Sequence, residues 1–244
     1  MQVRLDKFLA DAGCGTRSEV RDLIRKGRVT VDGNTEKKPE RKVDITSAGV
    51  QVDGTTMLCE TCSYYILNKP EGILSATRDG REKTVIDLIP EPKRRDLFPV
   101  GRLDKDTVGL LLITNDGKLS NRLMAPGKHV PKTYKARVSG TLPADLADRF
   151  SAGVDIGDET PTAPAEVRIF RALTVEEDNT PLHEVELTIT EGRYHQVKRM
   201  FEAVGCKVEH LERTAIANLT LPTDLPRGTA RKITLEELLA QLGI

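Results

Sequence analysis

Long hydrophobic runs are missing from the sequence, whose most extended apolar stretches are residues 109–114 and 64–67. A helix that crosses a membrane needs roughly 20 apolar residues, so neither stretch can form one. Residues 1–7 interleave charged and apolar side chains, and they lack the apolar core and small-residue cleavage site of a secretory signal. We therefore expect a cytoplasmic protein with no membrane partner.

Cysteine is scarce, with 4 residues in a chain of 244. Cys59 and Cys62 have the spacing of half a zinc or redox site. A structural zinc site needs four ligands, however, and the sequence offers no second pair with this spacing. Reduced thiols without a bound metal are the favoured interpretation.

The chain has no formal net charge, because 37 Lys and Arg residues balance 37 Asp and Glu residues. The two signs are not evenly distributed. Residues 17–28 hold five basic and two acidic side chains, residues 117–137 hold six basic and no acidic ones, and residues 145–186 carry most of the compensating negative charge. This asymmetry is typical of a protein with a cationic face for a polyanion, although each patch alone also fits an ordinary solvated surface.

The first part of the chain predicts a compact helical unit. Residues 5–12 form a short helix, and a second helix begins with Ser18 as its cap and ends at Gly27, before a strand over residues 28–31. Four arginines lie on or beside the second helix: Arg17, Arg21, Arg25 and Arg28. Their guanidinium groups can bind RNA phosphates, or they can serve only to keep the helix soluble.

These elements together resemble the S4 RNA-binding domain, through residues 4–9, 18–24 and 27–33. The resemblance covers about residues 2–48 and implies an anchor on RNA. The pattern weakens after residue 48. We accordingly predict an S4-like domain over residues 1–48, a linker over 49–62 and a larger domain over 63–244.

The larger domain alternates strand-like and helix-like segments. Strands are predicted at residues 64–68, 109–114, 133–138, 184–190 and 207–211, and helices at 84–89, 117–124, 143–152, 194–204 and 234–242. This mixed order, with several hairpin-like neighbours, favours an α+β fold over a doubly wound sheet.

The first candidate site is the loop over residues 101–109. Asp104 stands between two cations, Arg102 and Lys105, just before the apolar strand. Such a loop can hold a carboxylate rigid and charged, but its spacing alone names no reaction. Asp104 and Asp106 also have the spacing of a divalent-metal pair. Two carboxylates supply too few ligands for such an ion, and the flanking cations oppose its binding.

The second candidate site spans residues 191–201. Val197 and Phe201 form an apolar stripe on a predicted helix, while His195 and Lys198 recur on another face. Lys198 can reach into a neighbouring site. For His195 we favour a structural hydrogen-bonding role, with that of a general base as the alternative.

The two candidate sites together resemble the catalytic signatures of a known family. They are similar to the pseudouridine synthases of the RsuA, RluB, RluE and RluF branch, with further matches at residues 67–72, 132–134 and 211–213. The resemblance implies a small helical S4-like RNA-binding domain, followed by a catalytic domain with a mixed, mainly antiparallel sheet flanked by helices. Residues 194–201 are closer to the RsuA type, which acts on 16S rRNA uridine 516, whereas an acidic loop at 176–179 and the Cys59/Cys62 linker depart from the pattern.

The resemblance also implies roles for individual residues. Asp104 is the ionised carboxylate that acts on the ribose or the base, and Lys198 is its salt-bridge partner. Tyr134 stacks on the target uracil, Arg102 fills the space left by the flipped base, and Leu211 forms an apolar wall of the pocket. From the residues alone, Tyr134 and Leu211 could equally be core residues, and Arg102 could contact a phosphate.

The implied reaction isomerises uridine to pseudouridine in ribosomal RNA and needs no cofactor or metal. The expected partner is ribosomal RNA or a small-subunit assembly particle, and we expect a monomer because the sequence shows no coiled-coil pattern. Three alternatives stay open. They are the same reaction on a 23S rRNA uridine, a non-catalytic RNA-binding or ribosome-assembly protein, and a metal-dependent nuclease or phosphoryl transferase built on Asp104, Asp106 and Asp116.

Overall fold

The computed structural model describes residues 2–44, 48–57, 62–90, 96–174 and 180–243. These residues fall into two compact units, of which the first ends at Cys62 and the second begins at Ser63. Each unit has its own hydrophobic core. Cys59 and the acidic loop at 176–179 lie outside the described residues. Within the described part of the chain, no helix is long and apolar enough to cross a membrane.

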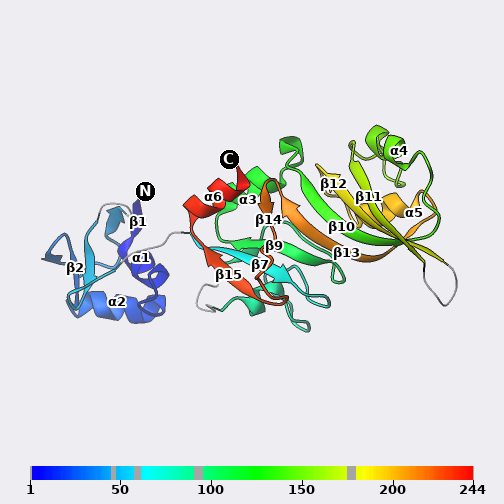
Figure 1. Cartoon of the computed structure of the whole chain (residues 1–244). Coiled ribbons are helices and arrows are strands. Elements are labelled where there is room, and N and C mark those ends of the chain that lie inside the picture. Colours follow the sequence, from blue (N-terminus) through cyan, green and yellow to red (C-terminus); the bar gives the residue numbers. More distant parts are fainter. Residues whose placement is uncertain (1, 45–47, 58–61, 91–95, 175–179, 244) are drawn as a thin grey trace. The chain divides into compact units, whose positions relative to one another are not determined.

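The first unit packs two helices against short strands (Figure 1). Its elements are β1 (Gln2–Arg4), α1 (Leu5–Asp11), α2 (Arg17–Arg25), β2 (Val29–Val31), β3 (Asn34–Thr35), β4 (Lys42–Asp44), β5 (Val50–Val52) and β6 (Thr55–Thr56). Strand β1 pairs with β4, and the other strands form a sheet in the order β3-β2-β5-β6. Leu5, Phe8 and Ile24 of the helices are buried against valines of the strands.

The cap of α2 is Thr16, so the prediction of Ser18 was wrong. The Thr16 hydroxyl accepts a hydrogen bond from Glu19 N at 3.3 Å, and the Glu19 carboxylate accepts one from Thr16 N at 2.7 Å. This reciprocal capping box needs a Glu or Gln three residues after the cap. Thr16 has one at that position and Ser18 does not, which explains where the helix begins.

The first unit continues beyond residue 48, where the sequence pattern predicts a linker. Strand β5 pairs with β2, with Val50 opposite Val31, and Val50 is fully buried. A second hairpin then joins β5 to β6 through Asp53-Gly54. The same valine alternation and Asp-Gly turn mark β2 and β3, and this repeated hairpin signal accounts for the longer unit.

A buried carboxylate ties the two helices of the first unit together. The side chain of Asp6 on α1 is 0% exposed and accepts hydrogen bonds from Arg4 Nε at 3.0 Å and from Arg21 Nε of α2 at 3.0 Å. The pKa of Asp6 is lowered to about 2, first by the hydrogen bond from Arg4 and then, against the opposing effect of burial, by Arg21. Asp6 is therefore ionised across the neutral range.

The second unit is built on a nine-stranded sheet flanked by helices. The main strand order is β11-β12-β10-β13-β9-β7-β15, with β14 paired to β13 and β8 to β9. The strands are β7 (Tyr64–Lys69), β8 (Phe98–Pro99), β9 (Val108–Thr114), β10 (Lys132–Ser139), β11 (Glu166–Thr174), β12 (Pro181–Ile189), β13 (Lys207–Ile216), β14 (Leu219–Thr220) and β15 (Ala230–Ile233). The helices are η1 (Val85–Leu88), α3 (Gly117–Met124), η2 (Pro126–Lys128), α4 (Leu146–Ala152), α5 (Gln196–Glu202) and α6 (Leu235–Leu242). Figure 1 shows α4 and α5 near one end of the sheet and α3 and α6 near the other.

The predicted elements of the larger domain are all present, with shifted ends. Strands β8, β11, β14 and β15 were missed by the sequence pattern. Most of β11 is exposed, including Ile169 and Phe170, so it lacks the clean alternation of a half-buried strand. Among the described residues, every strand pairing in the sheet is antiparallel except that of β9 with β13. The expected mixed, mainly antiparallel sheet is confirmed.

The parallel pairing of β9 with β13 depends on a glycine. Gly109 lies opposite Arg213 and has φ of +100°, a conformation that favours glycine. A Cβ atom on Gly109 would collide with the backbone carbonyl oxygen of Arg213. The two strands can approach this closely only because position 109 has no side chain.

Replacement of Asp6 by Asn should destabilise the first unit in a pH-dependent way. Because the pKa of Asp6 is lowered in the fold, its ionised form contributes stability above about pH 4, and this contribution is lost as the pH falls from about 4 to 2. At pH 7 the Asp6→Asn variant should lose about 2 kcal/mol of unfolding free energy, measured by amide hydrogen exchange in α1 and α2. The exposed Asp22, 3.8 Å from Arg25, provides the control, since Asp22→Asn should have little effect. Equal protection of wild type and Asp6→Asn at pH 7 would contradict this account.

Candidate active site

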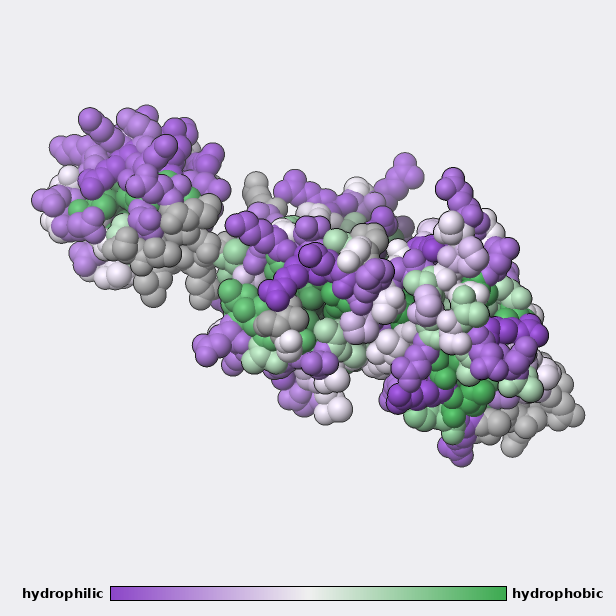
Figure 2. All heavy atoms as spheres, turned by 90° about the horizontal axis from the view of Figure 1, so that it is seen from above, coloured by the Kyte–Doolittle hydropathy of each residue, from purple (hydrophilic) through white to green (hydrophobic). Residues whose placement is uncertain are grey.

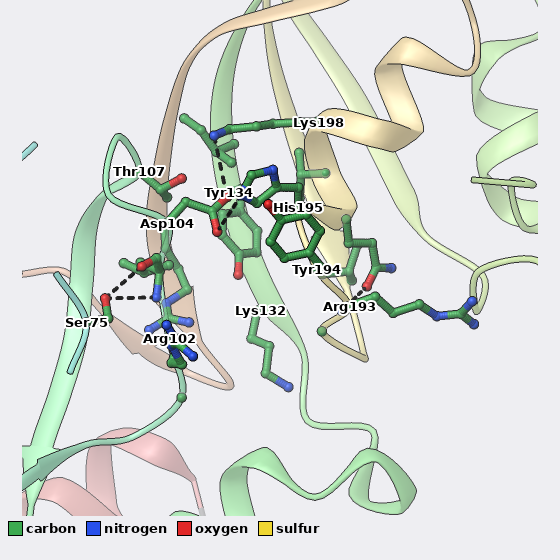
Figure 3. A pocket seen from close by; sticks show the side chains of 18 of the residues that line it. Ser75, Arg102, Asp104, Thr107, Lys132, Tyr134, Arg193, Tyr194, His195 and Lys198 are labelled. Atoms are coloured by element: carbon green, nitrogen blue, oxygen red, sulfur yellow. Dashed lines mark hydrogen bonds and ion pairs between the residues drawn. The ribbon is translucent and has the colours of Figure 1, made fainter. Parts of the chain in front are cut away.

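A cavity of about 580 Å³ lies in the second unit, beside the middle strands of its sheet. Its walls come from the loop at residues 101–107, from strands β10 and β13, and from residues 192–198 around the start of α5. The two candidate sites of the sequence, 101–109 and 191–201, therefore meet at one cavity. Figure 3 shows Asp104, Tyr134, His195 and Lys198 converging there.

The carboxylate of Asp104 faces two basic side chains across the cavity. Its Oδ1 lies 3.5 Å from His195 Nε2, and its Oδ2 lies 3.4 Å from Lys198 Nζ. The Asp104 side chain is 29% exposed, so a ligand in the cavity can reach it. The structure thus brings together the predicted pair of Asp104 and Lys198.

Lys198 has a second and closer acidic partner. Its ammonium group donates to both carboxylate oxygens of Asp106, at 2.6 and 2.8 Å. Burial acts to raise the pKa of Asp106, but the hydrogen bond and charge of Lys198 outweigh it and hold that pKa below its usual value. Asp106, which the sequence suggested as part of a metal site, therefore fixes the position of Lys198 beside Asp104.

His195 occupies a strained position at the start of α5. Its backbone is left-handed, with φ of 49° and ψ of 33°, a conformation that is uncommon for residues other than glycine. Its ring stacks on that of Tyr194, with 3.9 Å between centroids and 16° between planes. Tyr194 is 76% exposed and lines the cavity, although the sequence pattern gave no reason to select it.

Strands β10 and β13 form the floor of the cavity. Lys132 and Tyr134 are alternate residues of β10, and Leu211 and Arg213 are alternate residues of β13. All four are buried and line the cavity, and Tyr134 is paired with Arg213 across the two strands. Tyr134 and Leu211 are thus at once buried residues and cavity walls. The buried Lys132 and Arg213 lay within the matched motifs but were not singled out.

The loop that carries Asp104 is held by side chains from other strands and loops. Ser75 Oγ donates to Leu103 O at 2.7 Å and accepts from Leu103 N at 3.1 Å. Arg102, the residue before, is exposed and lines the cavity. The neighbouring backbone is therefore anchored while the Arg102 side chain extends from it (Figure 3).

Lys69, at the end of β7, holds the other half of this loop. Its side chain is fully buried, and its ammonium group donates to the carbonyl oxygens of Pro70, Asp104, Lys105 and Thr107 at 2.8–3.2 Å. Burial lowers the pKa of Lys69 to about 8, while nearby carboxylates, Asp106 and Asp104 among them, act to raise it. Sequence spacing could not reveal this role, because three of the acceptors are backbone atoms more than 30 residues away.

The three acids of the metal-site alternative are not gathered in one place. Asp116 caps α3, where its Oδ1 accepts from Lys118 N and Leu119 N and its Oδ2 from the hydroxyl of Tyr64. No group of three or more His, Cys, Asp or Glu side chains among the described residues is arranged to hold a metal ion. Asp104 and Asp106 share Lys198 instead.

The four arginines predicted to contact RNA lie on the first unit, whose surface is largely hydrophilic in the view of Figure 2. Arg17 and Arg25 are exposed on α2, and Arg25 lies 3.8 Å from Asp22. Arg21 is bound to the buried Asp6, and Arg28 forms a two-pronged ion pair with Asp53. Two of the four guanidinium groups are thus hydrogen-bonded within the unit, while their role toward RNA stays a prediction.

Comparisons with known proteins identify both units. Residues 63–203 match the family model described as RNA pseudouridylate synthase, and residues 3–52 match that of the S4 domain. This chain belongs to the RNA pseudouridylate synthase family. The match covers the Asp104 loop, β10 and the start of α5, so the cavity described above lies within the synthase domain.

Relatives of this synthase extend over nearly the whole chain. It is 43% identical to the protein named uncharacterized RNA pseudouridine synthase YtzG of Bacillus subtilis, over 97% of each chain. It is 39% identical to ribosomal small subunit pseudouridine synthase A of Vibrio cholerae, over 97% of this chain and 98% of the relative. Ribosomal large subunit pseudouridine synthase B of Bacillus subtilis is 38% identical, over 96% and 93%.

A solved structure supports the same conclusion. The crystal structure of a pseudouridylate synthase, 32% identical in sequence, superposes with a TM-score of 0.64 and covers 98% of this chain and 99% of its own. The likeness thus extends over nearly the whole of both chains, and the resemblance seen in the sequence is confirmed.

Replacement of Lys69 by Met should loosen the loop that carries Asp104. The side chains have similar length, but Met cannot donate to the four carbonyl oxygens, and each buried acceptor left unsatisfied costs about 1–3 kcal/mol. We expect a lower melting temperature and faster amide exchange at residues 104–107. Lys105→Met is the control, since it removes an exposed ammonium group from the same loop and should leave the melting temperature nearly unchanged. An unaltered exchange rate in Lys69→Met would show that the loop does not depend on Lys69.

Proposed function

We propose that this synthase converts a uridine of ribosomal RNA to pseudouridine, with Asp104 as the reacting carboxylate and uridine 516 of 16S rRNA as the target. The observation that carries the proposal is the position of Asp104. Its carboxylate is accessible in the cavity, beside His195 and Lys198 and above a floor that includes Tyr134. Catalytic carboxylates are commonly held in this way, charged and oriented by neighbouring groups.

Pseudouridine formation needs a positioned carboxylate, and the cavity supplies one in Asp104. Pseudouridine formation breaks the bond between uracil N1 and ribose C1′, turns the base, and joins C5 to C1′, so no net oxidation or energy input is required. Asp104 either attacks the substrate as a nucleophile or removes a proton from the sugar. Lys198 Nζ lies 3.4 Å from Asp104 Oδ2 and can hold the carboxylate in place for either route.

The target uridine must leave its stack to reach Asp104. We assign Tyr134 to stack on the uracil ring and Leu211 to form an apolar wall beside it, because both lie in the cavity floor. Arg102 is exposed at the cavity and would fill the space that the flipped base leaves in the RNA. These assignments follow the family motifs at the same positions.

The S4 domain would hold the RNA through charge. Arg17 and Arg25 are the exposed arginines on α2 and would contact phosphates. Arg21 and Arg28 would join them through the guanidinium donors that are not used in their ion pairs. We further propose that the protein works as a cytoplasmic monomer, without a cofactor, on 16S rRNA or on a small-subunit assembly particle.

A large-subunit target is the second candidate. The relative named ribosomal large subunit pseudouridine synthase B is 38% identical, and the one named small subunit synthase A is 39% identical. This difference is too small to choose a substrate, so the test must include both ribosomal RNAs.

Release of tritium from uridine C5 tests the reaction, because the C5 hydrogen is lost when C5 bonds to ribose. Labelled 16S and 23S rRNA transcripts, alone and with ribosomal proteins, would be incubated with the synthase in EDTA. We expect release from 16S RNA by wild type and none above background by Asp104→Asn, which keeps the side-chain shape but removes the charge. Asp148→Asn removes the same charge from the exposed face of α4 and should retain wild-type activity.

The pattern of release separates the candidates. Release from 23S rRNA alone would move the target to the large subunit, and primer extension would then locate the uridine. Full activity in Asp104→Asn would overturn the assignment of the carboxylate. Loss of activity on chelation would favour a metal-dependent enzyme.

A further inference from the structure

Two cations are buried in the floor of the cavity and have no acidic partner among the residues that the structure describes. Lys132 is 6% exposed and Arg213 is 2% exposed. Lys132 Nζ donates to the carbonyl oxygen of Val130 at 2.8 Å, and Arg213 Nε donates to that of Leu110 at 2.8 Å. Neither side chain forms an ion pair with any of the residues that the structure describes. Arg213 Nη2 is buried and has no hydrogen-bond partner there.

This arrangement is unfavourable in the absence of a ligand. A buried charge is normally paired or fully hydrogen-bonded, and a buried donor without an acceptor calls for an explanation. Lys69 satisfies that rule with four carbonyl acceptors, and Asp6 with two arginines. Lys132 does not, since its acceptor among the described residues is a single carbonyl oxygen, that of Val130, and burial and then the charge of Arg213 lower its pKa. The floor therefore lacks an acceptor that carries negative charge.

The location of the two cations indicates which part of the RNA supplies that acceptor. Lys132 lies two residues before Tyr134 on the same face of β10, about 7 Å along the strand. A flipped nucleotide enters a pocket base first, while its phosphates stay with the backbone at the entrance. Lys132 and Arg213, which line the floor beside Tyr134, are therefore placed to meet the base and not its phosphate, and Figure 3 shows Lys132 and Asp104 on different sides of Tyr134.

We propose that Lys132 and Arg213 bind the carbonyl oxygens of the flipped uracil and stabilise the negative charge that the ring acquires when its bond to ribose breaks. The proposal rests on the proposed function. When N1 separates from C1′, the electron pair stays on the uracil ring and is shared with O2 and O4, while Asp104 compensates the deficit at the sugar. The same pair then forms the C5–C1′ bond, the C5 hydrogen leaves as a proton to solvent, and N1 takes up a proton from solvent, so that the product is an isomer of the substrate.

The two cations also give the pocket a basis for selecting uracil. Uracil presents a carbonyl oxygen at C4, whereas cytosine presents an amino group that donates hydrogen bonds. Lys132 and Arg213 are donors without acceptor capacity, so an amino group in the same place would leave them unpaired. A site built to hydrogen-bond one group rejects an analogue that lacks it.

Lys132→Met tests the proposal, because Met has nearly the same shape and no charge. We expect the single-turnover rate on the modified rRNA to fall about 10²-fold, with a change of less than about threefold in the dissociation constant for the RNA. Lys132→Arg should recover part of the rate, since it restores a cation. Lys135→Met is the matched control, as Lys135 is exposed on the opposite face of the same strand, and it should keep the wild-type rate.

Two results would overturn the proposal. An unchanged rate in Lys132→Met would show that the charge does not act on the reaction. A weaker RNA affinity with an unchanged rate, together with a salt-dependence slope reduced by about one, would show that Lys132 contacts a backbone phosphate instead.

Binding of mononucleotides separates this proposal from the choice of RNA target. Wild type should bind uridine 5′-monophosphate more tightly than cytidine 5′-monophosphate, and Lys132→Met should lose that preference, in a titration that needs no turnover. A wild type that modifies no ribosomal RNA but keeps the preference would overturn the proposed substrate and leave the role of Lys132 standing. Equal affinity of wild type for the two nucleotides would overturn that role whatever the RNA target.

Discussion

The close approach of β9 and β13 at Gly109 is the constraint on which the rest of the cavity depends. The only parallel pairing in the described part of the large sheet occurs there, and it places the strand that follows the Asp104 loop beside the strand that carries Leu211 and Arg213. A side chain at position 109 would meet the backbone of Arg213. Because the contact is between backbones, no rearrangement of side chains could relieve it. Because position 109 has no side chain, β9 and β13 lie close together, and this sets the distance between the Asp104 loop and the cavity floor.

The basic side chains in and around the cavity have three different kinds of partner. Lys69 is buried but surrounded by carbonyl oxygens, so it acts as a clamp on the loop backbone. Lys198 bridges Asp106 and Asp104, and its shorter contacts are to Asp106. Lys132 and Arg213 have no acid at all among the described residues. Lys69 and Lys198 hold the Asp104 loop and its carboxylate in place. In the proposed assignment, Lys132 and Arg213 bind the ligand.

The sequence predicted those parts of the site whose signal is local. The glycine-bounded loop around Asp104 and the helical spacing at Lys198 were both readable, and the structure brings them together at one cavity. The α+β fold followed from the order of the apolar segments. A local pattern also gave a wrong result. Ser18 was predicted as the N-cap of α2, but Thr16 is the cap, because Glu19 stands three residues after it and completes the capping box.

What could not be predicted depends on partners that are distant in the chain. Arg21 has the spacing of an exposed RNA-binding residue, yet it is bound to Asp6 on another helix. Lys69 and Arg213 resemble ordinary charged residues within strands, and their burial follows only from the pairing of β7, β9 and β13. Strand β11 was missed because its side chains are largely exposed at the edge of the sheet.

An isomerisation that breaks one bond and forms another between the same two fragments makes opposite demands on the two sides of that bond. The ribose becomes electron-poor and the base electron-rich, and both return to neutrality when the new bond forms. In the proposed assignment the carboxylate of Asp104 lies on the side of the sugar, and the cations of β10 and β13 lie on the side of the base. A cavity with both signs of charge, held apart by a rigid sheet, can meet these demands without exchanging electrons with a cofactor. Because the pairing of β9 with β13 is fixed, the position of the Asp104 loop relative to the cations of the floor is fixed as well.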